Sequence, residues 1–150
     1  MHAARTAVAA TVSLAVAGLV RMPEAYWAPV STMIVMQSTL GASWSVSKKR
    51  LAGTVLGGVF GGLVATFFRP SLLVFGASIF ALGLVCAALR LHQSAYRFSG
   101  IALAIIVLVA RGVAPFVVAV HRCIEVSIGI LVALALAAVW PGRELAGDSP

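Results

Sequence analysis

Charged side chains are scarce in this chain. They make up 10% of its 150 residues, whereas hydrophobic residues make up 61% and the mean hydropathy is +1.07. A soluble domain carries roughly 25% charged residues, which it needs to cover its surface in water. The shortage excludes an ordinary soluble domain and predicts an integral membrane protein whose surroundings are the lipid bilayer.

Acidic residues are scarcer still. The chain has four acids against eleven lysines and arginines, so its net charge is +7. The cations lie between apolar runs rather than along one amphipathic face, and no aromatic-basic motif accompanies them. This distribution is typical of residues that orient a membrane protein in its bilayer. It does not predict nucleic acid as a partner.

Residues that could do chemistry are few and scattered. Cys86 and Cys123 lie in apolar segments and form no C-x-x-C pair, which is typical of packing residues. The histidines at positions 2, 92 and 121 are far apart in the sequence. No nucleophile–base pair, metal cluster or phosphate-binding loop can be assembled from this set. We therefore expect no enzyme activity, no cofactor and no metal site.

Six apolar runs follow one another along the chain. A helix needs roughly 20 apolar residues to cross a hydrocarbon core of about 30 Å. The predicted fold is an all-α integral membrane protein with six transmembrane helices within residues 1–141, followed by a short polar tail at 142–150. The expected spans are 1–20, 24–40, 48–68, 71–89, 98–110 and 116–140, with polar connections at 41–50 and 90–97. Residues 1–20 also fit a cleavable signal peptide, but they fit the first of several spans equally well.

The cations also predict the orientation of the spans. Six spans place both termini on the same side of the membrane. That side would hold seven cations: Arg5, Lys48, Lys49, Arg50, Arg90, Arg97 and Arg143. The other side would hold four: Arg21, Arg69, Arg111 and Arg122. Because cytoplasmic loops carry the excess of lysine and arginine, we expect a multi-pass protein of the cell (inner) membrane with both termini in the cytoplasm.

Glycine recurs at every fourth position of the third span. Gly53, Gly57 and Gly61 form one row within residues 48–68. In a soluble helix each would cost about 1 kcal/mol relative to alanine. In a membrane such a row lets a neighbouring backbone approach closely. We expect these glycines to pack against another helix, and we expect the remaining surface to support a homodimer or higher homo-oligomer.

The two halves of the chain resemble each other weakly. Residues 50–57, RLAGTVLG, match residues 122–129, RCIEVSIG, in having an arginine seven positions before a glycine. Tyr26-Trp27 similarly corresponds to Tyr96-Arg97. The match predicts two three-helix repeats, at about 4–69 and 71–140. An odd number of spans in each repeat makes the two repeats inverted, as in many transporters.

The repeat places one arginine at the start of a helix in each half. Arg50 and Arg122 would then lie near opposite mouths of a pathway that favours anions. Alternatively, both could anchor helix ends at the lipid headgroups. Glu125 is spaced to pair with Arg122 on one helix face, and it could instead be a proton-coupling carboxylate.

Several motifs together resemble a known family. They are YWAPVSTMIVMQSTLGAS at 26–43, KRLAGTVLGG at 49–58, YRFSGIALA at 96–104, HRCIEVSIGI at 121–130 and VWP at 139–141. This pattern is similar to the fusaric acid resistance, or aromatic acid exporter, family, to which the plant aluminium-activated malate transporters are related. The resemblance implies a dimeric six-helix domain that moves small organic anions, such as aromatic carboxylates or dicarboxylates. In the plant relatives, basic residues line an anion pore.

The resemblance also implies which residues line the pathway. By position, Arg50 and Arg122 match the arginines of two family motifs, and Thr54 and Glu125 are their neighbours. The predicted pathway also includes two further residues, Lys49 and Gln37. Many family members continue into a large cytosolic domain, which this sequence lacks. A non-transporting membrane scaffold subunit of a larger complex is therefore the alternative function.

Overall fold

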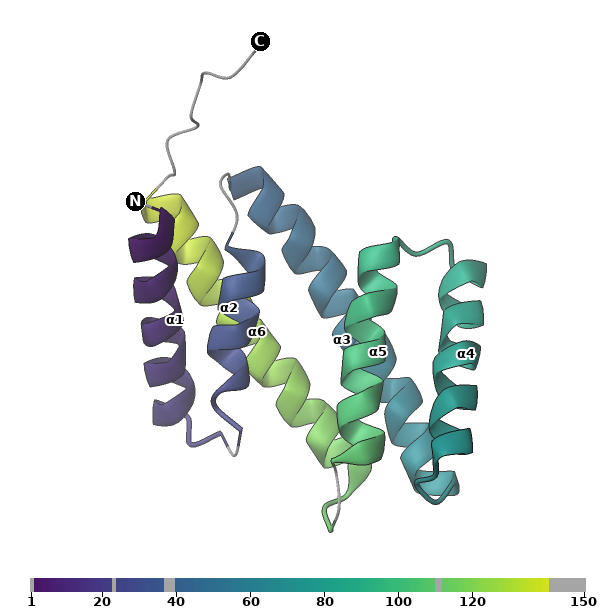
Figure 1. Ribbon diagram of the computed structural model, residues 1–150. Coiled ribbons are helices and arrows are strands. Elements are labelled where there is room, and N and C mark those ends of the chain that lie inside the picture. The colour runs from purple at the N-terminus through teal and green to yellow at the C-terminus, as the bar shows by residue number, and fades with distance from the viewer. Residues whose placement is uncertain (1, 23, 37–39, 110–111, 141–150) are drawn as a thin grey trace. The chain divides into compact units, whose positions relative to one another are not determined.

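The structure, a computed structural model, describes residues 2–22, 24–36, 40–109 and 112–140 (Figure 1). This part of the chain forms six helices and no strand, which confirms the all-helical prediction. The helices are α1 (His2–Leu19), α2 (Trp27–Val35), α3 (Leu40–Phe67), α4 (Leu72–Ala88), α5 (Gln93–Leu108) and α6 (Pro115–Val139).

The helices differ in whether they are long enough to cross a membrane. Among the described residues, α3 and α6 are long and apolar enough to do so. Helices α1, α4 and α5 are apolar but shorter, and α2 has only 9 residues. These features fit a membrane protein. Six spans arranged as inverted repeats stay a prediction.

Three predicted boundaries are wrong. Helix α3 begins at Leu40, so the expected polar connection at 41–50 is helical, and α5 begins at Gln93 inside the expected connection at 90–97. The second apolar segment ends as a helix at Val35 rather than at position 40. Polar side chains do not stop α3 because the helix itself satisfies them: the Ser47 hydroxyl donates to the Ser43 carbonyl one turn back, at 2.8 Å.

The chain divides into two compact units, which are described separately. Unit one comprises Met1–Ser47 and Ser127–Pro150, and unit two comprises Lys48–Val126. In unit one, α1 and α2 pack side by side (Figure 1). The beginning of α1 also meets the end of α6, where an Arg5 Nη donates to the Trp140 carbonyl at 2.9 Å. A cation at the carboxyl end of a helix satisfies a carbonyl that has no partner within the helix.

Unit one contains a close contact between α6 and α2 at Gly129. A Cβ added to Gly129 would meet the Ala28 carbonyl oxygen and would lie 2.6 Å from the Ser31 Cβ. The Thr32 hydroxyl donates to the Gly129 carbonyl at 3.0 Å. Glycine lets the two backbones come this close, and the hydroxyl then bonds across the contact.

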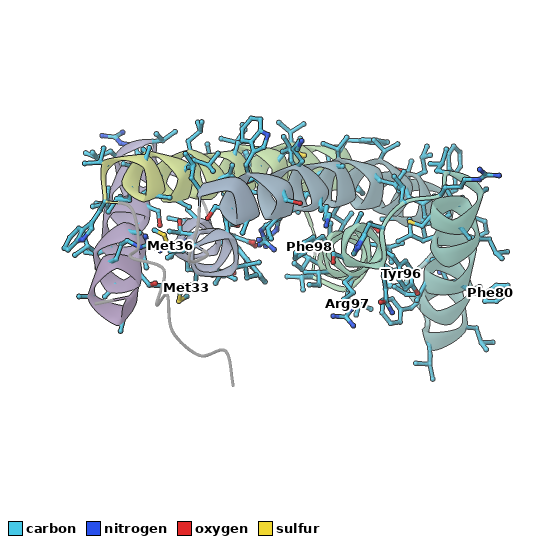
Figure 2. The ribbon with its side chains drawn as sticks, turned by 90° about the horizontal axis from the view of Figure 1, so that it is seen from above. Met33, Met36, Phe80, Tyr96, Arg97 and Phe98 are labelled. Carbon is cyan, nitrogen blue, oxygen red and sulfur yellow. The ribbon has the colours of Figure 1, made fainter. Side chains whose placement is uncertain are left out.

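In unit two, α4 packs on α5 around Leu82, Cys86, Leu103 and Val107. Figure 2 shows Tyr96 pointing from α5 towards α4, where it packs against this core.

The glycine row of α3 lies against α5. A Cβ on Gly57 would meet the backbone of Ser99, with the Ser99 Cα at 2.7 Å, and a Cβ on Gly61 would lie 3.1 Å from the Leu103 Cα. The neighbouring glycine Gly58 faces α6 instead, where its Cβ would lie at an ordinary 3.5 Å from the Ala119 Cβ. One helix therefore uses two adjacent glycine rows to contact two different neighbours.

We expect Gly57→Ala to lower the free energy of unfolding by about 2 kcal/mol or more, because the new methyl group would overlap a backbone that cannot move aside. Thermal denaturation of the detergent-solubilised protein measures this loss. Gly58→Ala, at the next position of the same helix, is the matched control and should leave stability nearly unchanged. Equal stability of the two variants would contradict the α3–α5 contact.

A second prediction concerns unit one. Gly129→Ala should destabilise the protein by a similar amount, about 2 kcal/mol, because its Cβ would overlap α2. Gly41→Ala is the control in the same unit, since nothing lies within 4 Å of an added Cβ there. The same denaturation measurement applies, and a Gly129→Ala protein as stable as the control would refute the α2–α6 contact.

Candidate functional site

Three charged side chains are buried in unit two. Arg50 on α3 and Arg122 on α6 are each 4% exposed, and Glu125 on α6 is 1% exposed. We call these three residues the charged cluster. Charged groups within membrane helices are costly, and they usually mark a polar pathway or a binding site.

Within unit two, α3 packs against α6, and these two helices carry the three residues of the charged cluster. Gly58 faces Ala119, and Gly62, one turn further along α3, faces Phe116, so the two helices run antiparallel within this unit. A Cβ on Gly62 would lie 3.0 Å from the Phe116 ring. The two helices therefore meet without bulky side chains on the α3 side.

Arg122 and Glu125 form an ion pair on α6. An Arg122 Nη lies 3.4 Å from a Glu125 Oε, and the spacing is one helical turn. This distance exceeds the 2.7–2.9 Å typical of a charge-assisted hydrogen bond. Charge attraction, rather than a short hydrogen bond, accounts for the contact.

Arg50 lies over an aromatic ring. Its guanidinium carbon is 5.0 Å from the centroid of the Phe98 ring on α5, within the range of a cation–π interaction. Gly53 helps to bring Phe98 there, because an added Cβ would lie only 2.8 Å from the Phe98 Cβ. Figure 2 shows Phe98 and Tyr96 on different sides of α5, and Arg97, which is exposed, pointing away from α4.

The two arginines lie in the same compact unit. Both lie in unit two, where each charge acts on the other. That they occupy opposite mouths of a pathway stays a prediction. From the sequence, each arginine is predicted to lie at the start of a helix. In the structure α3 begins at Leu40, so Arg50 lies well inside this helix.

The cluster carries more positive than negative charge. Glu125 is the one acidic residue in the sequence from Lys48 to Val126, and the same stretch holds eight lysines and arginines. Unit two thus holds two buried guanidinium groups and one buried carboxylate, and the carboxylate pairs with Arg122. Such a site can attract an anion, and the guanidinium fork matches carboxylate geometry.

The other predicted pathway residues are less centrally placed. Thr54 is 5% exposed. Its hydroxyl donates a hydrogen bond to the Arg50 carbonyl, one turn back in α3, at 2.8 Å. Lys49 is partly exposed on α3. Gln37 lies outside the described residues. Sequence reasoning missed Phe98 as a partner of Arg50, although it lies in one of the motifs that carried the family resemblance.

The side chains of the charged cluster are buried, each at most 4% exposed. A groove of about 600 Å³ runs along α3 between Lys48 and Val59, and another of about 250 Å³ lies beside Phe60. Both are lined almost entirely by apolar side chains, and neither includes a residue of the cluster. In the described residues, no group of three or more histidine, cysteine or acidic side chains could hold a metal ion.

The long apolar helices, together with charge buried inside them, fit the class of helical membrane proteins. The chain belongs to the family described as fusaric acid resistance protein-like, which matches residues 9–136 and confirms the resemblance seen in the sequence. The inner membrane protein YeeA of Escherichia coli (strain K12) is 28% identical over 150 residues. The match covers 95% of this chain and 41% of that protein, so this chain spans about two fifths of the relative's length. No solved structure matches the chain.

A double-mutant cycle tests the contact between Arg50 and Phe98. We expect Arg50→Met and Phe98→Leu to be coupled by about 0.5–2 kcal/mol in stability, because each removes one partner of a desolvated cation–π pair. Unfolding of the parent, the two single variants and the double variant in detergent gives the coupling. Arg97→Met with Phe98→Leu is the control cycle, and additivity in both cycles would exclude the interaction.

Proposed function

We propose that this protein transports organic anions, such as aromatic carboxylates, across the inner membrane along a pathway that passes Arg50 and Arg122. The observation that carries the proposal is the charged cluster, in which two guanidinium groups and one carboxylate are buried among the helices of unit two. Charged groups within membrane helices are costly, and they commonly mark the pathway of a substrate or an ion.

The surroundings of the cluster fit an aromatic carboxylate. A guanidinium group can bind a carboxylate through two parallel hydrogen bonds. Phe98 lies beside Arg50 and offers a ring against which an aromatic substrate could pack. Because the cluster is buried, transport requires a conformational change that opens it to one side of the membrane at a time.

The comparisons support the membrane setting of this proposal. The chain belongs to a family described by resistance to fusaric acid, which is itself an aromatic acid, and its relative is an inner membrane protein. Export of such acids would explain resistance.

The proposed topology is two inverted repeats with both termini in the cytoplasm. Gly57 packs against Ser99, and Gly129 packs against Ala28. The two glycines are 72 residues apart and their partners are 71 apart, which is the relation expected of repeats. The contact between Arg5 and the end of α6 supports placing the two ends of the helical domain on the same side. A homo-oligomer, which would cover part of the exposed apolar surface, completes the proposal.

Transport in proteoliposomes tests the function directly. We expect the parent protein to take up labelled benzoate, and we expect Arg50→Ala and Arg122→Ala each to lower the rate about tenfold or more. Either variant removes one of the two buried guanidinium groups that would attract the anion. Arg97→Ala is the matched control, because it removes an exposed arginine of the same unit.

Two results would contradict the proposal. Full benzoate uptake by both cluster variants would remove the charged cluster from the pathway. No uptake of benzoate or succinate by the folded, inserted parent would favour the alternative, a scaffold subunit that transports nothing itself.

A further inference from the structure

We propose that the groove along α3 binds an anionic phospholipid, with an acyl chain in the groove and the phosphate at the end marked by Lys48 and Arg90. The site lies within unit two. It concerns the lipid around the protein, so it holds whether or not the protein transports anions.

The wall of the groove is a single apolar stripe of α3. Its residues recur every three or four positions, which places them on one face of the helix. They are Lys48, Leu51, Ala52, Val55, Leu56 and Val59, and Leu91 from the α4–α5 connection joins them. Lys48 is the charged member of this set. The groove therefore suits a ligand with a long apolar part and a negative charge at one end.

The length of the groove fits one leaflet of a bilayer. A helix rises about 1.5 Å per residue, so the distance along α3 from Lys48 to Val59 is about 16 Å. The hydrocarbon core is about 30 Å thick, and the acyl chains of one leaflet fill half of it, about 15 Å. A lipid whose phosphate lies at Lys48 therefore places its acyl chain along the whole groove.

Lys48 and Arg90 lie at the same end of unit two. Helices α3 and α4 are joined by a short connection after Phe67 and run in opposite directions (Figure 1). The α4–α5 connection, which contains Arg90 and Leu91, therefore lies at the end where Lys48 lies. Both cations are exposed, and the sequence from 40 to 109 contains no aspartate or glutamate. This end attracts a phosphate, and no acid on α3, α4 or α5 repels it.

Arg90 adopts a backbone conformation that favours glycine. Its φ is 51°. It follows the end of α4, where its N–H donates to the Ala87 carbonyl at 3.0 Å and the Leu91 N–H donates to the Cys86 carbonyl at 2.9 Å. Glycine is the usual residue at this point of such a motif, because a side chain is disfavoured there. An arginine in its place indicates that the side chain has a use, and a phosphate at the end of the groove provides one.

A second copy of the chain fits the groove less well. A two-fold partner in the same membrane presents the same surface, so its Lys48 and Arg90 would approach those of the first copy. Like charges that face each other weaken such an interface. An anionic lipid meets the same cations with the opposite charge.

Native mass spectrometry of the detergent-solubilised protein tests the headgroup. The probes are dioleoyl phosphatidylglycerol and dioleoyl phosphatidylcholine, which share their acyl chains and differ in net charge. We expect the parent to bind phosphatidylglycerol about tenfold or more tightly. Lys48→Gln and Arg90→Gln should each lower the affinity for this lipid about fivefold, the contribution of one cation near an anionic headgroup, and leave the affinity for phosphatidylcholine unchanged.

Arg97→Gln is the matched control for these two variants. Arg97 is an exposed arginine of the same unit, and Figure 2 shows it pointing away from α3. This variant should keep the parent's preference for phosphatidylglycerol. Equal binding of the two lipids by the parent would overturn the inference, because the groove would then hold annular lipid only. An equal loss of affinity in all three variants would also overturn it, since net protein charge would explain the preference.

A second pair of variants tests the groove itself. Ala52→Phe places a ring in the groove and should lower the affinity for phosphatidylglycerol about fivefold or more, because the acyl chain loses apolar contact. Leu63→Phe is the control, since Leu63 is exposed on the same helix and lines neither groove. Unchanged binding by Ala52→Phe contradicts the placement of the acyl chain.

The other possible occupants give different results. Displacement of bound phosphatidylglycerol by benzoate would assign the groove to the proposed substrate and remove the lipid site. Dissociation of an oligomer by Ala52→Phe, with binding of phosphatidylglycerol retained, would assign the groove to a second copy of the chain. Absence of benzoate uptake by the parent counts against the proposed function alone, because lipid binding is measured without transport.

Discussion

Close contact between helix backbones is the constraint on which this structure depends. Lipid is as apolar as leucine, so membrane helices gain little by burying apolar side chains against each other, and they must gain stability from tight packing instead. Here α3 meets α5 at Gly57, and α6 meets α2 at Gly129, where an added Cβ would overlap the opposite backbone. Each of the two units thus contains at least one such contact. The bulk of the larger side chains is left for the outer, lipid-facing surface and for the core between α4 and α5.

This packing also determines where the charged residues lie. Gly53 admits Phe98 close to α3, and the Phe98 ring then lies against Arg50. Gly58 and Gly62 admit α6, which carries Arg122 and Glu125 into the same unit. Small residues on α3 therefore bring together an aromatic ring from α5, one charge from α3 itself and two charges from α6. The chemistry of the site follows from packing, because none of these groups would be buried together if the helices were held further apart.

Much of the fold could be predicted from the sequence, because apolar runs and helix-ending prolines are local signals. The last span, expected at 116–140, is found as Pro115–Val139. The start of α3 could not be predicted in the same way. Its serines look like a loop in the sequence, whereas a serine hydroxyl can return to its own helix, as Ser47 does. The proximity of Arg50 to Arg122 is a relation between helices, and periodicity within one helix carries no information about it. Phe98 was missed as a partner of Arg50 for the same reason.

The hydrogen bond between Arg5 and the Trp140 carbonyl has a consequence for longer relatives. It holds the beginning of the first helix next to the end of the last. Polypeptide that precedes α1 and polypeptide that follows α6 would then begin at neighbouring points of unit one. Both extensions could therefore contribute to one body without a long linker. A fold closed in this way can acquire segments at either end while its helices keep their orientation.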